Sequence, residues 1–477
     1  MNRENAQSEK FIMMTTEPVE KLIGKLAVPT IISMLVTTFY NMADTYFVGK
    51  IGMDQTETVK AVMQTRAQAA VGVVMALMAI IQAVGFFFGH GSGNYVSRAL
   101  GRKELDKAEK IAVAGFGYAI IVGLLMAVLG NVFARPLAFL LGANGDTVGY
   151  TVDYMRLILV GAPINMASIV LNNQMRFQGN ATYAMFGISF GAVLNIGLDA
   201  LFILVFDMEV MGAALATFIG QAVSFVLLLV GISKSDCIKL RLKAFRLEKH
   251  SFAEISRGGL PSLGRQGIAG VSTACLNHMA GIYGAIAYGT EAAGASAIAA
   301  MGVVSRVMLF AASALIGFGQ GFQPVCGFNY GAGLYDRVRK AFWYCVKVAL
   351  GFLILLAIPA YVLSGDIIAL FRGNDEVAME IGTIAMRLQI ITFPVMSWVV
   401  MSNMMLQTMG KVVSATLLAV ARNGLMFIPA ILLLPLIFGL LGVQLAQPVA
   451  DILSLALAVP VTVKVLKELP QNASEKL

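Results

Sequence analysis

The chain has 477 residues, of which 58% are hydrophobic and only 13% are charged, and its formal net charge is +8. Its mean hydropathy of +0.78 excludes an ordinary soluble domain and predicts a membrane protein. Four cysteines stand far apart without the spacing of a metal site, so neither a disulfide framework nor a metal centre is predicted.

Apolar stretches of the length that crosses a bilayer as a helix, about 20 residues, recur along the whole chain. No stretch alternates apolar and polar residues as a membrane barrel does, so helices are the expected spanning elements. The sequence therefore predicts an all-α polytopic membrane protein with twelve transmembrane helices. The expected spans are 22–48, 66–97, 111–133, 148–175, 182–206, 210–232, 259–288, 293–328, 341–363, 378–406, 413–437 and 440–464.

The basic residues indicate how the helices are oriented. The N-terminal segment is polar and lacks the apolar core of a signal peptide, so it is expected to stay on the mature protein. If it is cytoplasmic, most of the 35 Lys and Arg fall on cytoplasmic segments. We therefore predict a multi-pass protein of the cell membrane with both termini in the cytoplasm. Its positive charge is expected to face anionic lipid rather than nucleic acid.

The second half of the chain repeats the first. Residues 137–163 match 368–394 at an offset of 231. The same offset aligns Arg156 with Arg387, Pro163 with Pro394, Asn172 with Asn403 and Gly179 with Gly410. Six helices per half is an even number, so the repeat is parallel and predicts two six-helix lobes that flank a central cavity. The predicted units are lobe 1–232, a basic cytoplasmic connection 233–257 and lobe 258–477.

Six motifs occur in order along these spans: "LAVPTIISMLVTTFYNMADTYFVGKIG" in the first helix, "GHGSGNYVSRALGRKELDKAEK", "NNQMRFQGNATYAM", "NIGLDALFI", "GLPSLGRQG" and "FNYGAGLYDRVRKA". With them the chain resembles the multidrug and toxic compound extrusion (MATE) transporters, in particular the bacterial branch related to DNA-damage-inducible protein F. The resemblance implies cation-driven export of diverse small organic molecules. It implies no enzymatic activity and no cofactor other than the coupling ion.

Carboxylates in the first lobe are the candidate coupling residues. Asn195 and Asp199 are four residues apart and so share one helix face, and Tyr40 and Asp44 have the same spacing. The resemblance implies that these four and Thr217 surround one cation-binding cavity. If the ion is Na⁺, the oxygens of Asp44, Asn195, Asp199 and Thr217 are suitable ligands. Two neighbouring carboxylates out of water also bind and release protons readily, so H⁺ is the other possibility.

Further polar residues lie in the predicted spans. Candidates to line the substrate cavity are Arg306, Asn172, Asn173 and Gln82. Arg306 is expected either to line the cavity or to pair with Asp451, Arg265 to be able to reach the membrane interface, and Arg387 to be structural. Arg156 is taken as the nearest in-span base of the first lobe. His90 and His278 are interpreted as packed residues, and residues 53–68 as an extension of the outer mouth.

These observations favour a secondary antiporter over other classes. No nucleotide-binding loop or catalytic triad stands out, which argues against ATP-driven transport and against a membrane enzyme. We expect export of amphipathic or cationic organic compounds in exchange for inward H⁺ or Na⁺. The alternatives are a flippase or exporter of a lipid-linked or anionic metabolite, and a non-transporting scaffold of two fused copies. Small organic substrates and membrane lipids are the expected partners, with no obligate protein partner.

Overall fold

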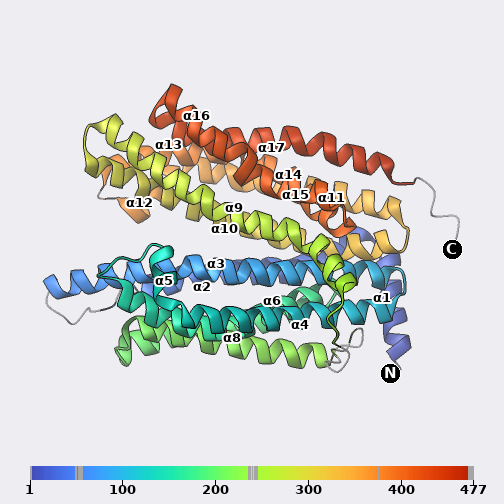
Figure 1. The fold of residues 1–477 in the computed structure, drawn as a ribbon. Coiled ribbons are helices and arrows are strands. Elements are labelled where there is room, and N and C mark those ends of the chain that lie inside the picture. Colours follow the sequence, from blue (N-terminus) through green and yellow to red (C-terminus); the bar gives the residue numbers. More distant parts are fainter. Residues whose placement is uncertain are drawn as a thin grey trace.

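The computed structural model describes residues 3–48, 51, 57–234, 238, 240, 245–373 and 375–470. Long helices form nearly all of this part of the chain (Figure 1). In chain order they are α1 (Arg3–Thr16), α2 (Val19–Val48), α3 (Glu57–Gly101), α4 (Leu105–Val132), α5 (Ala134–Leu140), α6 (Val148–Phe177), α7 (Ala181–Asp199), the π-helix η1 (Ala200–Val205), α8 (Glu209–Ser233), α9 (Lys249–Tyr288), α10 (Glu291–Gly331), α11 (Tyr335–Val362), α12 (Ser364–Arg372), α13 (Glu376–Thr392), the 3₁₀ turn η3 (Phe393–Val395), α14 (Met396–Met409), α15 (Val412–Val420), the π-helix η4 (Ala421–Met426), α16 (Phe427–Phe438) and α17 (Leu440–Glu468).

The predicted spans correspond to these helices. Eleven segments of the described chain are long and apolar enough to cross a membrane, and three of them join shorter pieces: α7 with η1, α13 with α14, and α15 with α16. The remaining predicted span, 259–288, lies in α9 and is not among the eleven. This helix carries the polar residues Arg265, Gln266, Asn277 and His278. A polar helix can still cross the bilayer where it faces other helices or a cavity.

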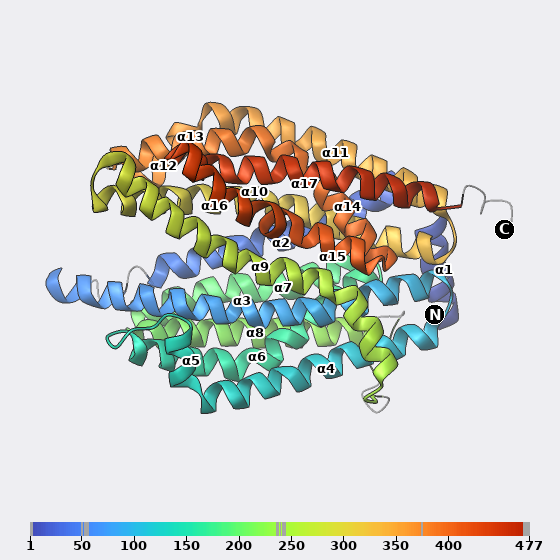
Figure 2. The ribbon, with the colours of Figure 1, turned by 45° about the horizontal axis from the view of Figure 1, so that its top comes forward.

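The helices form two lobes. Figures 1 and 2 show α2 to α8 together on one side and α9 to α17 on the other. Between the lobes α2 packs on α10 and α3 packs on α9, which are corresponding pairs of the two halves. The apolar core of each lobe also contains residues from the start of the other half of the chain. Met14, Leu22 and Leu26 pack in the core of the second lobe, and Ile255 packs in that of the first.

The internal repeat is visible in single hydrogen bonds. Asn172 Nδ2 donates to the carbonyl of Ala184 (3.0 Å), and at the same offset Asn403 Nδ2 donates to Ala415 (2.6 Å). Gly179 and Gly410 both have left-handed backbone conformations, with φ of +79° and +78°. Glycine adopts this conformation without the steric cost of a Cβ and commonly ends helices. The parallel repeat predicted from the sequence is therefore confirmed.

One end of the interface between the lobes is closed by direct backbone contact. Gly101 of α3 lies against the carbonyl of Phe328, and Gly331 of α10 lies against the carbonyl of Arg98. A Cβ at either glycine would overlap the opposing oxygen, so these positions let the two helices touch. This closed end lies toward the chain termini, and the lobes separate toward the opposite end (Figure 1).

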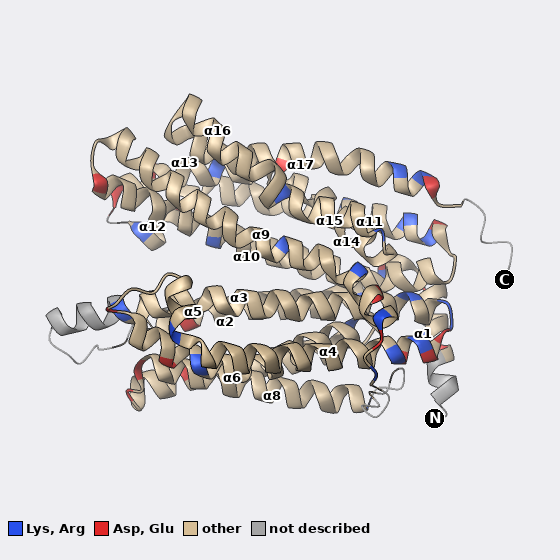
Figure 3. Cartoon of the chain, viewed as in Figure 1, with Lys and Arg blue, Asp and Glu red and all other residues tan. Residues whose placement is uncertain are grey.

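Charged residues gather at the two ends of the helices, while most of the middle is uncharged (Figure 3). This distribution is the one expected of a protein whose middle lies in hydrocarbon. Within the predicted connection 233–257, the chain is already helical from Lys249. Of the predicted extension 53–68, residues 53–56 lie outside the described part, and α3 begins at Glu57. That extension is therefore largely an elongation of α3.

Candidate ion and substrate site

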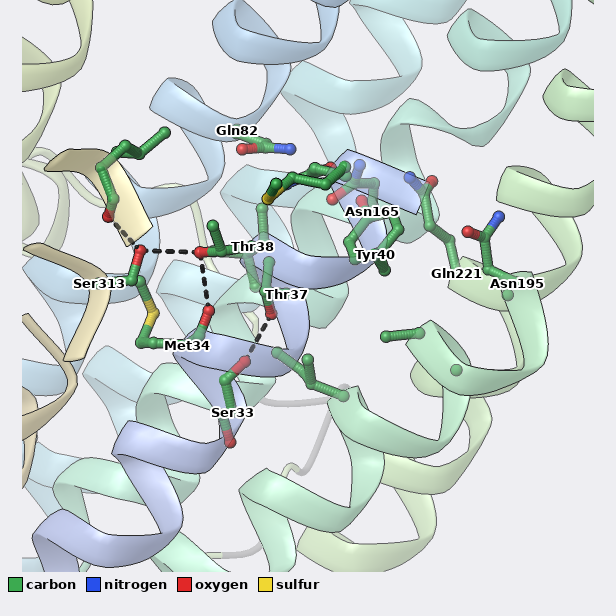
Figure 4. Close-up of a pocket in the computed structure, with 18 of the residues that line it drawn as sticks. Ser33, Met34, Thr37, Thr38, Tyr40, Gln82, Asn165, Asn195, Gln221 and Ser313 are labelled. Carbon is green, nitrogen blue, oxygen red and sulfur yellow. Dashed lines mark hydrogen bonds between the residues drawn. The ribbon is translucent and has the colours of Figure 1, made fainter. Parts of the chain in front are cut away.

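A cavity of about 1050 Å³ lies between the lobes and reaches toward their separated end. Helices α2, α3, α6, α7 and α8 of the first lobe and α9 and α10 of the second contribute most of its wall. Hydroxyl and amide side chains such as Ser33, Thr37, Asn165 and Gln221 point into it (Figure 4). Thr38 of α2 and Ser313 of α10 share a hydrogen bond of 2.7 Å across the cavity wall.

The structure brings the five predicted coupling residues together at the first-lobe wall. Tyr40, Asn195 and Thr217 line the cavity from α2, α7 and α8. Asp44 and Asp199 lie behind them, with 7% and 0% of their surface exposed. The two carboxylates are close enough to interact electrostatically with each other and with Tyr40. The four-residue spacing on α2 and on α7 places each pair on one helix face, as expected.

Asn195 links the acid to the neighbouring helix. In one orientation of its amide, Nδ2 donates to Thr217 Oγ1 (3.4 Å). In the other, Nδ2 donates to Asp199 Oδ2 (3.2 Å) and the amide oxygen accepts from the Thr217 backbone N–H (3.0 Å). The second orientation satisfies more groups, because the carboxylate gains a donor and the amide oxygen gains a partner. Asn195 thus holds α7 and α8 in register at the site.

Two carboxylate oxygens of the site are unpaired. Asp44 Oδ1 and Asp199 Oδ1 are buried and accept no hydrogen bond from the described residues. An ionised carboxylate buried in this way is costly unless a cation or proton neutralises it. The donor set of carboxylate, amide and hydroxyl oxygens therefore fits either a small metal cation or a proton.

The structure adds one residue to this set that the sequence did not reveal. Tyr154 of α6 is 1% exposed and interacts with Asp44, Asp199 and Tyr40, and its hydroxyl lies near Thr217. Tyr154 is one of several aromatic residues in an otherwise apolar span, so the sequence pattern did not distinguish it from a packing residue. Only the approach of α6 to α7 and α8 shows its position.

The four residues predicted to line a substrate cavity all lie in the wall of this cavity: Arg306, Asn172, Asn173 and Gln82. The two asparagines also donate hydrogen bonds to backbone carbonyls. Asn172 donates to Ala184, and Asn173 Nδ2 donates to the carbonyl of Ile169 (2.7 Å). Gln82 projects into the cavity from α3 (Figure 4).

The arginine assignments need correction. Asp451 pairs with Arg422, whose Nε lies 2.8 Å from Oδ1, so the suggested pairing of Asp451 with Arg306 is wrong. The π-helix η4, which carries Arg422, meets α17 at this point, whereas Arg306 of α10 faces the cavity. Arg265 lines the cavity as well, instead of reaching the membrane interface.

The structure also shows what Arg387, Arg156 and Arg176 contact. Arg387 donates to Ser364 Oγ (2.9 Å) and stacks over the Tyr361 ring, which agrees with a structural role. Arg156 is exposed, and Arg176 is the basic residue of the first lobe that reaches the cavity. The predicted end of that span at residue 175 left Arg176 in a connection, but α6 continues to Phe177.

His90 is packed and hydrogen-bonded, as interpreted from the sequence. Its Nδ1 lies 2.9 Å from Ser262 Oγ of α9, and its ring stacks on Phe86. Ser262 in turn accepts from Gln407 Nε2 (2.7 Å), so the histidine belongs to a polar contact between the lobes. His278, in contrast, is exposed on α9.

Comparison with known proteins gives the family. The sequence profile of the MatE family matches residues 29–201 and 271–432. The chain is 26% identical over 467 residues to the multidrug export protein MepA of Staphylococcus saprophyticus, and the match covers 97% of each chain. A structure described as the outward-facing conformation of a multidrug resistance MATE family transporter superposes with a TM-score of 0.87 at 22% identity, covering 97% of this chain and 99% of the other. A structure of the Vibrio cholerae MATE transporter VcmN superposes with a TM-score of 0.84 at 20% identity, covering 94% and 97%. The chain therefore belongs to the MatE family of membrane transporters, which are not enzymes.

Proposed function

We propose that this protein is a secondary antiporter of the cell membrane that exports amphipathic organic compounds in exchange for inward H⁺ or Na⁺. The observation that carries the proposal is the pair of buried carboxylates with unpaired oxygens directly behind the cavity wall. A cation that binds there would change the charge beside the cavity, and so couple ion binding to substrate release. The relatives named for multidrug export support the direction of transport.

The five predicted residues have separate roles in this proposal. Asp44 and Asp199 bind the ion, while Asn195 and Thr217 orient Asp199 and could complete a Na⁺ site with their oxygens. Tyr40 separates the carboxylates from the cavity. With both termini in the cytoplasm, the separated end of the lobes would face the outside, which is the state that releases substrate and takes up the ion.

Efflux from proteoliposomes under separately imposed H⁺ and Na⁺ gradients tests the proposal. Asp44→Asn and Asp199→Asn keep the side-chain size but remove the charge, so both should lose gradient-driven efflux. Asp153→Asn is the matched control, because Asp153 is exposed on α6 of the same lobe. Wild-type rates in Asp199→Asn would exclude that residue from coupling, and the gradient that drives efflux identifies the ion.

A further inference from the structure

The charged residues that line the cavity are all positive. They are Arg176, Arg265, Arg306 and Arg372, and no Asp or Glu occurs among the described residues of the lining. Arg372, the last residue of α12, interacts electrostatically with the carboxylate of Asp375. The other three, Arg176, Arg265 and Arg306, form no ion pair with a carboxylate of the described residues.

The three buried acids of the described chain, Asp44, Asp199 and Asp451, lie away from these arginines. Asp451 pairs with Arg422 and also accepts from Gln447 Nε2 (2.8 Å). Asp44 and Asp199 lie behind the first-lobe wall and make no ion pair with a described arginine. Arg176, Arg265 and Arg306 thus make no ion pair with a described carboxylate, in contrast to Arg372.

Arg176 shows this most clearly because it is 4% exposed. It donates to the neutral amide oxygens of Asn173 (2.6 Å) and Gln320, and its Nε has no hydrogen-bond partner in the described structure. Arg265 approaches from the second lobe, and the guanidinium groups of Arg176 and Arg265 are both close enough to His90 to interact with it electrostatically. A buried guanidinium without a counter-ion is costly, and an anion that bridges the two lobes would relieve that cost.

The rest of the cavity suits an amphipathic molecule. Met34, Met42, Met75, Phe86, Leu309 and Ile316 contribute apolar surface. Methionine side chains adapt to unlike shapes, and arginine binds carboxylate, sulfonate or phosphate with two parallel hydrogen bonds.

We propose, building on the export function above, that the exported compounds are anionic amphiphiles whose acidic group is held by Arg176 and Arg265, with Arg306 as a further contact along the cavity. A cationic compound would meet three unneutralised arginines in this space. The proposal concerns equilibrium binding and so can be tested apart from ion coupling.

Two xanthene dyes of similar shape and opposite charge provide the test, namely fluorescein and rhodamine 6G. Binding to the full-length protein in detergent is measured by fluorescence anisotropy without any ion gradient. Fluorescein should bind at least tenfold more tightly than rhodamine 6G. Arg265→Gln and Arg306→Gln should each weaken fluorescein binding about tenfold, the usual value of a charge-assisted hydrogen bond.

Control variants separate loss of charge from loss of fold. Arg265→Lys keeps the charge and should retain most of the binding. Arg387→Gln removes an arginine of the same lobe that lies outside the cavity and should bind like the wild type. The thermal stability of each variant is measured in parallel. Tighter binding of rhodamine 6G, or unchanged fluorescein binding in well-folded Arg265→Gln and Arg306→Gln, would overturn the proposal.

Competition identifies the source of the acidic group. Displacement of fluorescein by soluble organic carboxylates or phosphate esters would indicate a free anionic compound, and displacement only by an anionic lysophospholipid would indicate a lipid headgroup. Either result supports an anion site. Failure of gradient-driven efflux with intact anion binding would count against the coupling mechanism and leave the substrate class standing.

Discussion

Arg422 and Asp451 form a pair whose carboxylate is almost fully buried, while Arg306 of α10 faces the cavity, whose described lining contains no acid. The difference matters because an arginine that neutralises a buried acid stabilises the fold, whereas an arginine that faces a cavity is available to a ligand. Residues of one type in the same lobe therefore have different roles, which depend on what each side chain faces.

Removal of Arg422 should destabilise the protein. Arg422→Ala leaves Asp451 buried without its partner and should cost about 3 kcal/mol. The double variant with Asp451→Ala should recover part of this loss, because no unpaired charge remains. Thermal unfolding in detergent measures both effects, with Arg306→Ala as the control that should melt like the wild type. Equal melting temperatures for Arg422→Ala and the wild type would contradict this reading of the pair.

Tyr154 offers a second test at the coupling site. Tyr154→Phe removes only the hydroxyl near Asp44, Asp199 and Thr217 and keeps the buried ring. We expect a normal melting temperature and a change of several-fold in the ion concentration that gives half-maximal efflux. Tyr150→Phe, on the same helix and outside the cavity lining, is the control. An unchanged ion dependence would show that Tyr154 only packs.

At the scale of the helices, repeat-related positions of the two lobes can carry different residues that make the same kind of hydrogen bond. At the start of α13, Asp375 Oδ1 accepts from the backbone N–H of Ala378 (2.9 Å). At the repeat-related position, Asn144 Oδ1 accepts from Thr147 N–H (3.0 Å). A hydrogen bond to the Ser296 side chain and then the one from Ala378 lower the pKa of Asp375. The two lobes thus use an acid and an amide for the same local task.

This comparison predicts a pH-dependent contribution. Asp375→Ala should lower stability by about 1 kcal/mol, the usual value of an N-cap, and Asp375→Asn should lower it less. Because the pKa of Asp375 is lowered in the folded state, its extra stabilisation is complete above the unfolded value of about 3.9 and is lost as the pH falls through the folded value. Melting curves at pH 7 and pH 3 check this. A difference between Asp and Asn that is as large at pH 3 as at pH 7 would contradict it.

On the scale of the whole molecule, the lobes touch near the termini and separate at the other end. If the termini are cytoplasmic, the cavity faces outward. Single cysteines in a cysteine-free protein test this orientation. Gly145→Cys, at the end opposite the termini, should react with an impermeant reagent in intact cells. Lys234→Cys, at the end of α8, should react only after permeabilisation. The reverse pattern would invert the predicted topology.

An anionic substrate, as proposed above, would have a consequence for the electrical balance of transport. Inward movement of a cation and outward movement of an anion both carry positive charge inward. A membrane potential that is negative inside should therefore accelerate export of fluorescein, even without a chemical gradient of the ion. One-for-one exchange with a cationic compound would carry no net charge and should not respond. Efflux at potassium-clamped potentials distinguishes these outcomes.

Much of this protein could be predicted from the sequence alone. Apolar stretches of membrane-spanning length identified the twelve helices, and the offset of 231 identified the parallel repeat. The four-residue spacings placed Tyr40 with Asp44 and Asn195 with Asp199, because a helix puts such residues on one face. These features depend on local geometry and on the thickness of the bilayer, which hold whatever surrounds the helix.

Only the tertiary structure decided which side chains meet between helices. It paired Asp451 with Arg422, added Tyr154 to the ion site, and placed Arg176 and Arg265 at the cavity. Hydropathy identifies a spanning helix but not the face it turns to each neighbour, because lipid and protein interior are equally apolar. Those faces are set by the packing of the helices against one another, and the charge of the cavity follows from that packing.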